Sequence, residues 1–358
     1  MALGKTQNSR FLLANNGNFG YFSFKFAKSS EILYNCYVSS YYWGATFVVQ
    51  FLLALFKSIR PRQALKNLSL FAPLVFSGNL FVQKKFLTVV WTTIIFTILA
   101  SSIYLINDIF DLPKDRLHPF KKNRPIASGK LPIPVALFIA IAGIFISLYL
   151  AYWQNFFFFL AEFTYLVLQL VYTLVLKNII VLDVISIAGG FVLRVYAGAL
   201  AINVHMNVWF LLCVVSLALF LAVGKRRAEL AVLTEKLAAS HRKTLTFYTP
   251  TLLDSYLSMF ANSAWLAYAL FTFFAPPPPI GARLPFLAVL PLTLAGINKW
   301  LMLTIPIVIY GIMRYMNIIY QGSRAESPET VLLGDKPLLA TVLIWGLMVV
   351  GILYGVKP

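Results

Sequence analysis

The chain has 358 residues, of which 60% are hydrophobic and only 12% are charged, and its formal net charge is +18. Soluble domains are nearer half apolar and a quarter charged, so this composition excludes a soluble globular protein and predicts a polytopic α-helical membrane protein. The apolar runs do not alternate in polarity, which excludes a β-barrel, and the bases lie between apolar runs, which excludes a nucleic-acid partner.

Residues 1–57 are predicted to form an N-terminal extension, and residues 58–358 a transmembrane domain. The extension contains one long apolar run, Ile32–Phe56, which fits a further membrane helix, an interfacial helix or an appendage. Nine apolar runs in the rest of the chain approach the 20 or so residues that cross a bilayer. These runs are Lys66–Phe81, Phe86–Ile106, Ile133–Trp153, Phe156–Leu176, Leu182–Ala201, Val208–Val223, Leu252–Phe274, Trp300–Met316 and Leu338–Tyr354.

Lysine and arginine are distributed unevenly between the two sides of the membrane, if the nine runs are taken as nine spans. The loops before the first run, after the second and after the sixth are strongly basic. The other side carries only Lys84, Lys85, Arg283, Lys299 and Lys357. Because cytoplasmic loops are enriched in lysine and arginine, the basic loops are predicted to face the cytoplasm. The expected location is the inner (plasma) membrane, with a multi-pass chain and a cytoplasm-facing site.

Rare acidic residues gather in the loop after the second run, NDIFDLPKDRLHPFKKNRPIASG. The whole chain has 12 acidic residues, and three of them lie in this short segment. In a helix, Asn107, Asp111 and Asp115 lie on one face because they are four residues apart, and Asp108 flanks that face. Oxygen ligands of this kind suit Mg²⁺, so these four residues are the predicted metal ligands. The alternative is a helix end whose acids form weak surface pairs with neighbouring bases.

A basic strip follows the acidic cluster directly. It contains His118, Lys121, Lys122 and Arg124. An acidic metal site beside basic residues suits a metal-bound diphosphate, because the metal bridges phosphate oxygens and the bases neutralise the remaining charge. A solvated face or a membrane anchor is the alternative explanation of the strip.

The pattern N-D-x-x-D-x-x-x-D resembles the first aspartate-rich motif of the UbiA-type intramembrane prenyltransferases, nine-helix enzymes that bind a diphosphate through Mg²⁺. Four other segments resemble one branch of that family, the decaprenyl-phosphate phosphoribosyltransferases. They are RPRQALKN at Arg60–Asn67, LDVISIAGGFVLRVYAGALA at Leu182–Ala201, GKRRAEL at Gly224–Leu230 and ESPETVLLGDKPLL at Glu326–Leu339. The resemblance begins near residue 58 and implies an all-α bundle around a cytoplasm-facing cavity.

The loop after the sixth run departs from the wider family. Prenyl-transferring members carry a second aspartate-rich motif there, whereas this chain has Lys225, Arg226, Arg227 and Glu229. Lys225 and Glu229 are four residues apart and can pair on one helix face. A basic motif can hold phosphates directly, which favours substrates with several phosphates.

The resemblance implies Mg²⁺-dependent transfer of 5-phosphoribose from phosphoribosyl diphosphate to a polyprenyl (decaprenyl) phosphate, for cell-envelope polysaccharide precursors. The predicted catalytic residues are Asp111, Asp115, Lys225 and Glu229. The predicted substrate-binding residues are Arg60, Lys66, His118, Lys122, Arg124, Arg194, Lys225 and Arg226. Arg194 lies inside the fifth run, where an ionisable residue usually faces a cavity or a partner, and a structural pair with Asp183 is its alternative.

Two other functions stay open at this point. An aromatic prenyltransferase of the same fold would use a prenyl diphosphate, and the basic loop Gly224–Leu230 argues against it. A transporter would carry charges along its membrane helices, but here they gather at helix ends, with Arg194 as the main exception. A homo-oligomeric assembly is left open by the sequence.

Overall fold

The structure is a computed structural model that describes residues 49–117, 121–232, 247–275, 299–321 and 328–355, and four short strands before residue 24. The strands β1 (Arg10–Phe11) and β4 (Phe22–Ser23) pair antiparallel, as do β2 (Ala14–Asn15) and β3 (Asn18–Phe19). The chain divides into two units, Met1–Ala54 and Leu55–Pro358, and the expected boundary after residue 57 stays a prediction. His118 and most of the run Ile32–Phe56 lie outside the described residues.

Eight helices of the described part are long and apolar enough to cross a membrane, which confirms the predicted all-α membrane fold. They are α3 (Gln83–Phe110), α5 (Ile133–Gln154), α6 (Phe156–Leu174), α7 (Leu182–Ala201), α8 (Val208–Val232), α10 (Pro250–Phe274), α13 (Ile305–Tyr320, preceded by the 3₁₀ helix η6, Trp300–Thr304) and α15 (Lys336–Tyr354). The shorter helices are Val49–Ile59, η1 (Pro61–Phe71), α2 (Ala72–Phe76), α4 (Leu112–Leu117), η2 (Lys121–Asn123), η3 (Leu176–Asn178) and α14 (Pro328–Gly334).

The first predicted run, Lys66–Phe81, differs most from its expected bounds. It begins earlier, at Pro61, and consists of 11 residues of 3₁₀ helix followed by five residues of α-helix. A 3₁₀ helix rises about 2.0 Å per residue and an α-helix 1.5 Å, so these residues still reach roughly 30 Å, the thickness of a bilayer core. The helix ends at Phe76 and is followed by Gly78 with a φ of 75°, a conformation that glycine adopts freely.

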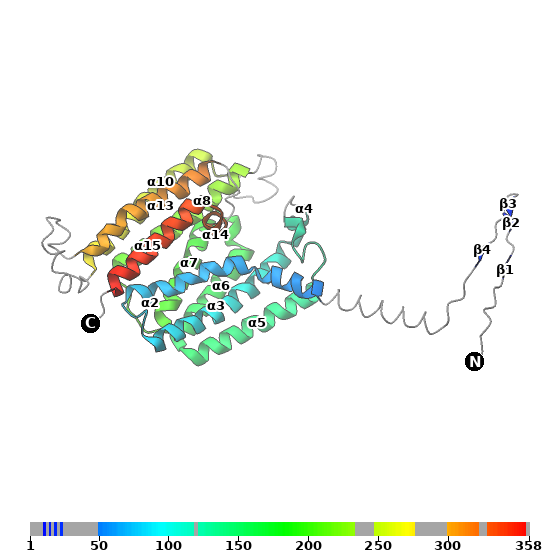
Figure 1. The fold of residues 1–358 in the computed structure, drawn as a ribbon, viewed down its shortest axis with the longest axis horizontal. Coiled ribbons are helices and arrows are strands. Elements are labelled where there is room, and N and C mark those ends of the chain that lie inside the picture. Colours follow the sequence, from blue (N-terminus) through cyan, green and yellow to red (C-terminus); the bar gives the residue numbers. More distant parts are fainter. Residues whose placement is uncertain are drawn as a thin grey trace, which may run out of the picture. The chain divides into compact units, whose positions relative to one another are not determined.

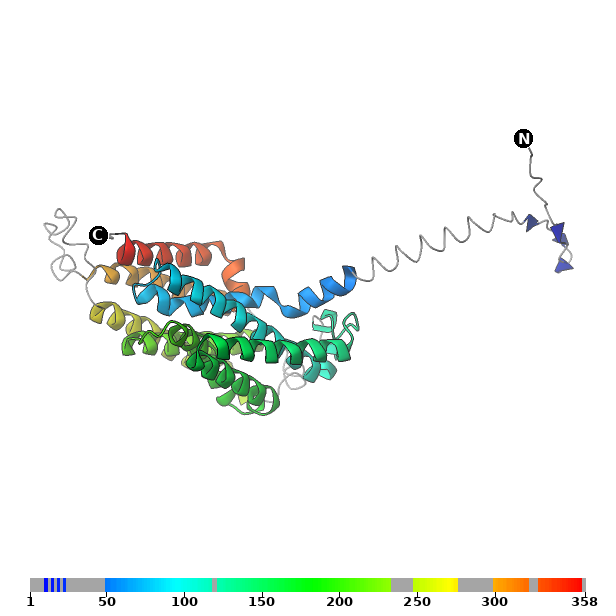
Figure 2. The same cartoon turned by 90° about the horizontal axis from the view of Figure 1, so that it is seen from below.

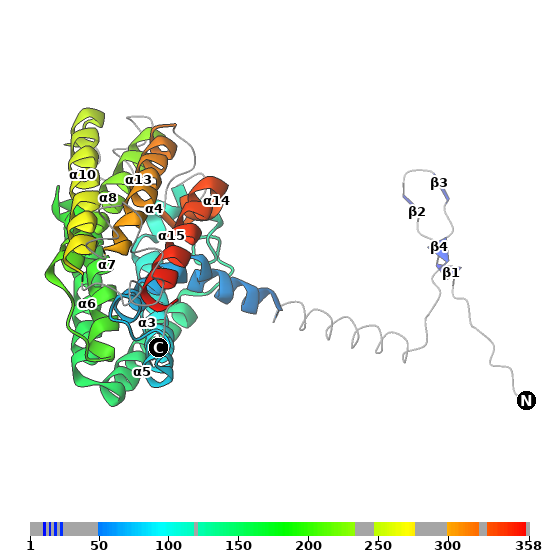
Figure 3. The ribbon, with the colours of Figure 1, turned by 60° about the vertical axis from the view of Figure 1, so that its left-hand side comes forward.

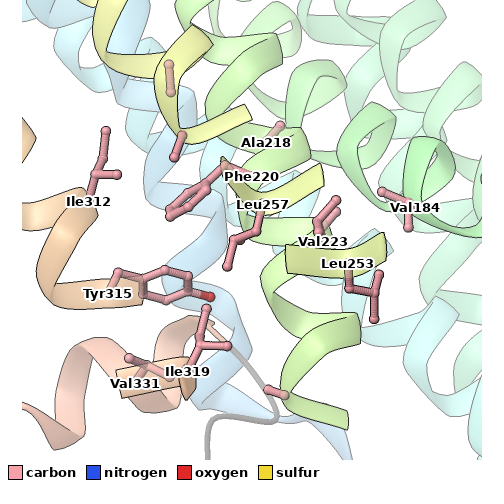
Figure 4. Packing of buried hydrophobic residues seen from close by; sticks show 14 of the residues in the cluster. Val184, Ala218, Phe220, Val223, Leu253, Leu257, Ile312, Tyr315, Ile319 and Val331 are labelled. Carbon is pink, nitrogen blue, oxygen red and sulfur yellow. The ribbon is translucent and has the colours of Figure 1, made fainter. Parts of the chain in front are cut away.

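The membrane helices form two groups that meet at α7. One apolar cluster joins η1, α3, α5, α6 and α7, and a second joins α7, α8, α10, α13 and α15 (Figures 1 and 3). In the second cluster, Phe220 of α8 and Leu257 of α10 point toward Tyr315 of α13 (Figure 4). The rings of Phe220 and Tyr315 are 5.4 Å apart.

Close packing of small residues brings the first helix against α7. A Cβ atom added to Gly198 would overlap the carbonyl oxygen of Leu70 in η1. Lipid supplies no hydrophobic force between membrane helices, so such close backbone approaches are what stabilise their association. The arrangement places the start of η1 at the same end of the bundle as the end of α3, and α4 and α14 also lie at this end, away from the C-terminus (Figures 1 and 2). The acidic and basic motifs are therefore brought together at one end, called the polar end below.

Candidate active site

Asp108 and Asp115 share one arginine. The Arg124 Nη1 atom donates to Asp108 Oδ1 at 3.0 Å and to Asp115 Oδ2 at 2.6 Å. Both carboxylates are buried, whereas the Arg124 side chain keeps 28% of its surface exposed. Asp108 also forms an ion pair with Arg60. Two predicted metal ligands and two predicted substrate-binding residues thus meet in one cluster.

Arg60 has an unusual backbone conformation. Its φ of 56° and ψ of 62° lie in the left-handed region, and it caps the start of η1. Its guanidinium lies 5.1 Å from the centroid of the Tyr104 ring. Residues other than glycine rarely adopt this conformation, and such residues cluster at functional sites because surrounding contacts must hold them. The ion pair with Asp108 and the ring contact are two such contacts.

Asn107 and Asp111 keep the expected common face, whereas Asp115 has a different partner. The backbone does continue in helical fashion, since Asp115 N donates to Asp111 O at 2.9 Å. α3 ends at Phe110 and α4 begins at Leu112, and Asp115 in α4 pairs with Arg124. Asp111 accepts from Lys177 at 2.7 Å and Asn107 from Thr173 at 3.3 Å, both on the neighbouring α6–η3 segment.

The partners of the acids also differ from the surface-pair alternative. Asp108 pairs with Arg60, Asp111 with Lys177, and Asp115 with Arg124, nine residues further on. Lys177 was missed by the sequence analysis, although a single lysine directly after the fourth apolar run was a signal that could have pointed to it. The acidic cluster is therefore assembled by tertiary contacts between η1, α3, α4 and η3.

A cavity of about 290 Å³ opens beside this cluster. It is lined by Lys57, Ser58, Arg60, Gln63, Asp108, Asn123, Arg124 and Pro125. Its wall combines one carboxylate with several bases, which suits an anionic ligand that arrives with a cation. Lys122 is exposed on η2 and does not line the cavity.

The residues at the cluster fit Mg²⁺ in part. Within the described ranges, no group of three or more His, Cys, Asp or Glu side chains is arranged to hold a metal ion. Asp108 and Asp115 nevertheless converge on one cationic atom of Arg124. One or two carboxylates are the usual protein ligands of Mg²⁺ where substrate phosphates complete its shell. These two residues fit that role, whereas Asn107 and Asp111 face Thr173 and Lys177.

A second polar cluster surrounds Arg226 of α8. The side chain of Arg226 is fully buried and donates to Asp183 Oδ2 at 2.7 Å, to Glu229 Oε2 at 2.5 Å and to Tyr172 Oη at 3.2 Å. Three protein partners therefore already surround the predicted substrate-binding guanidinium. Glu229 accepts from Arg226, and it also acts electrostatically on Lys225, its predicted partner four residues earlier.

Lys225 and Lys66 belong to the same region. The charge of Lys225 lies within electrostatic reach of Glu229, Tyr172 and Lys66. Lys66 in turn forms an ion pair of 3.2 Å with Glu329 of α14. The two lysines come from the first helix and from α8, and they lie within electrostatic reach of each other. Glu329 could not be predicted from the sequence, because no local pattern marks a partner so far along the chain.

Arg194 lies apart from the cavity. It is buried and donates to Asn67 Oδ1 at 2.9 Å, to Gly190 O at 2.7 Å and to Tyr165 Oη at 2.6 Å. The alternative pair with Asp183 is wrong, because Asp183 bonds to Arg226 instead. Arg194 joins η1 to α6 and α7, and its predicted contact with substrate stays a prediction.

Comparison with known proteins places this arrangement in a family. Residues 68–332 match the UbiA prenyltransferase family. A decaprenyl-phosphate phosphoribosyltransferase of Corynebacterium glutamicum is 34% identical over 302 residues, 83% of this chain and 86% of that protein. The protein of the same name from Mycolicibacterium smegmatis is 34% identical over 296 residues, 81% of this chain and 89% of that protein.

The fold agrees with solved structures. A UbiA homolog from Archaeoglobus fulgidus bound to DMAPP and Mg²⁺ superposes with a TM-score of 0.60 at 20% identity, covering 84% of this chain and 99% of that one. At that identity the likeness concerns the fold alone. The resemblance carried by the sequence motifs is confirmed by the family match, and the chain belongs to the UbiA prenyltransferase family of multi-pass, membrane-embedded transferases.

Proposed function

We propose that this transferase moves 5-phosphoribose from phosphoribosyl diphosphate to a polyprenyl phosphate such as decaprenyl phosphate, in a Mg²⁺-dependent reaction that releases diphosphate. The observation that carries the proposal is the meeting of Arg60 and Arg124 with Asp108 and Asp115 beside the cavity. The names of the two bacterial relatives support the phosphoribosyl and lipid-phosphate parts of the reaction.

In the first cluster, the acidic residues would hold the metal and the arginines would bind the diphosphate leaving group. Asp108 and Asp115, with Asn107 and Asp111 as further predicted ligands, would hold Mg²⁺, which when bound neutralises charge on the diphosphate and so helps it to leave. Arg60 and Arg124 line the cavity with planar guanidinium groups, which suit bidentate contacts with phosphate oxygens. Their present carboxylate partners keep both guanidinium groups at the cavity wall before a donor binds.

The second cluster would hold the other phosphates. Lys66 and Lys225 lie within electrostatic reach of each other, with Glu229 beside Lys225, so they offer two ammonium groups to the ribose 5-phosphate of the donor. In the reaction, a lipid phosphate oxygen forms a bond to C1 of the ribose while the bond from C1 to the diphosphate oxygen breaks. The attacking oxygen is already anionic near neutral pH, so the reaction needs no general base.

A phosphoribosyltransferase and an aromatic prenyltransferase would use the second cluster differently. An aromatic prenyltransferase would need only one diphosphate site, whereas bases in both clusters provide for separate phosphates. We place the polar end in the cytoplasm of a plasma-membrane protein, because phosphorylated sugars are made there and the basic loops favour that side. The product would serve as a precursor of cell-envelope polysaccharide.

A product assay tests the proposal. Purified protein in detergent, given phosphoribosyl diphosphate, Mg²⁺ and polyprenyl phosphate, is expected to release diphosphate and to form lipid-linked phosphoribose. Asp111→Asn should lower the rate at least about tenfold, because it removes a carboxylate from the acidic cluster. Asp254→Asn is the matched control, since Asp111 pairs with Lys177 at 2.7 Å and Asp254 likewise pairs with a base, Arg227, at 2.6 Å. Transfer from a prenyl diphosphate without any phosphoribosyl product would refute the proposal.

A further inference from the structure

The junction between η3 and α7 contains a strained turn. Val181 has a φ of 69° and a ψ of −46°, and the amide of Leu182 donates to the carbonyl of Ile180 at 2.8 Å. This bond between residues two apart defines a γ-turn of the rare, strained form. A β-branched residue with positive φ is an outlier that persists only where surrounding contacts hold it.

One tyrosine hydroxyl holds this turn. The amide of Val181 donates to Tyr248 Oη at 2.8 Å, and the same hydroxyl donates to Asp183 Oδ1 at 2.8 Å. Tyr248 is 3% exposed, and Asp183 is fully buried. Burial raises the pKa of Tyr248 to about 12, so the hydroxyl keeps the proton that it donates. Tyr248 lies just before α10, so it ties that segment to the start of α7.

The bonds continue from Asp183 to the second polar cluster. The other carboxylate oxygen of Asp183 accepts from Arg226, and Arg226 donates to Glu229. Tyr248 is thereby connected through Asp183 and Arg226 to the last turns of α8, which also carry Lys225. Because each buried donor and acceptor in this series has a partner, the orientation of those turns depends on the whole series.

We propose that Tyr248 is a positioning residue whose hydroxyl holds the γ-turn at Val181 and the carboxylate of Asp183, an arrangement called the clamp below. The clamp orients the end of α8, and this end presents Lys225 and Glu229 to the phosphoribosyl donor. The part that concerns the donor rests on the proposed function. The clamp itself rests on the strained turn and on the hydrogen bonds of Tyr248.

Tyr248→Phe removes the hydroxyl and keeps the ring. We expect the KM for phosphoribosyl diphosphate to rise about tenfold, while kcat and the KM for the lipid stay within about twofold, because a misplaced end of α8 weakens donor binding. A merely structural loss would lower the amount of active enzyme, and so the apparent kcat, with KM unchanged. That result would overturn the proposal.

Tyr268→Phe is the matched control. Tyr268 is also buried, and its hydroxyl also has two partners, Thr304 at 2.6 Å and Trp345 at 2.9 Å, but these lie on η6 and α15. We expect its donor KM to stay within about twofold of the wild type, because its bonds do not reach α8. An equal rise of KM in both variants would refute a specific role for Tyr248.

A rescue variant tests the strained turn directly. Glycine adopts positive φ without strain, so Val181→Gly should make the turn independent of the clamp. In the Tyr248→Phe background, we expect Val181→Gly to restore the donor KM to within about threefold of the wild type. A double variant as poor as Tyr248→Phe alone would show that the tyrosine does not act through this turn, and would overturn the clamp.

Amide hydrogen exchange gives a readout that needs no activity. The Val181 amide should exchange at least about tenfold faster in Tyr248→Phe than in the wild type or in Tyr268→Phe, because it loses its acceptor. If the wild type transferred no phosphoribose, the proposed function would be refuted. The exchange experiment would still show whether Tyr248 holds the turn at Val181. Unchanged exchange in Tyr248→Phe would overturn the clamp whatever the substrate.

Discussion

Arg124→Met is the variant that probes the acidic cluster most directly. It removes the guanidinium whose Nη1 atom lies 3.0 Å from Asp108 Oδ1 and 2.6 Å from Asp115 Oδ2, and it leaves a side chain of comparable length. Because a bound divalent cation needs the same two carboxylates, Arg124 competes with it when no donor is present. The variant should therefore bind a divalent cation more tightly than the wild type.

The size of the effect follows from these two contacts. A hydrogen bond to a charged group contributes about 1.5–3 kcal/mol when it is buried. The Arg124 side chain is 28% exposed, so solvent screening reduces its two contacts. Taken together they oppose cation binding by about 1–2 kcal/mol, which corresponds to a dissociation constant about 5- to 30-fold lower in the variant.

The assay is a titration with Mn²⁺, which takes the same oxygen ligands as Mg²⁺ and is detected by electron paramagnetic resonance. Arg314→Met is the control, because Arg314 pairs with Asp335 at 2.7 Å. Its side chain is 32% exposed, a fraction similar to the 28% of Arg124. Its Mn²⁺ affinity should stay within about twofold of the wild type. Mn²⁺ binding to Arg124→Met that is no tighter than to the wild type would refute the competition.

Two further variants test the packing around the site, by thermal unfolding and size-exclusion chromatography in detergent. Arg226→Met leaves the fully buried Asp183 without its charged partner and should destabilise the fold by about 3–5 kcal/mol, whereas adding Asp183→Leu should recover most of that loss. A double variant no more stable than Arg226→Met would contradict this account. Gly198→Ala should lower the folded fraction strongly, because its Cβ overlaps Leu70 O, whereas Gly346→Ala has open space and should be neutral. Equal behaviour of the two glycine variants would contradict the close approach of η1 to α7.

The sequence predicted the membrane helices well, because an apolar run of about 20 residues has few alternatives to a spanning helix. Its failures have physical causes. The first run was placed five residues late, because η1 is a 3₁₀ helix that begins at Pro61 with polar residues and so lacks a local apolar signal. Asp115 pairs with Arg124, whereas Asn107 and Asp111 face the α6–η3 segment, and a four-residue spacing alone does not reveal this difference.

The acidic residues of the site could be predicted from the sequence, whereas the pairing of each with a particular basic residue could not. Asp108, Asp111 and Asp115 stand out because acids are rare in this chain. Lys177, by contrast, lies 66 residues from Asp111, and nothing in either local pattern records that they meet. Tyr248 is still harder to find, since a tyrosine at a helix start has no motif and acquires its role only from the folded position of Val181.

The ion pair between Lys66 and Glu329 has a consequence for the synthesis of the protein. Lys66 leaves the ribosome among the first membrane residues, and Glu329 belongs to α14, just before the last spanning helix. Membrane helices insert in order from the N-terminus, so the amine stays without this carboxylate during most of translation. In a nascent chain that stops before residue 329, the amine of Lys66 lacks this carboxylate, and the arrival of α14 supplies it.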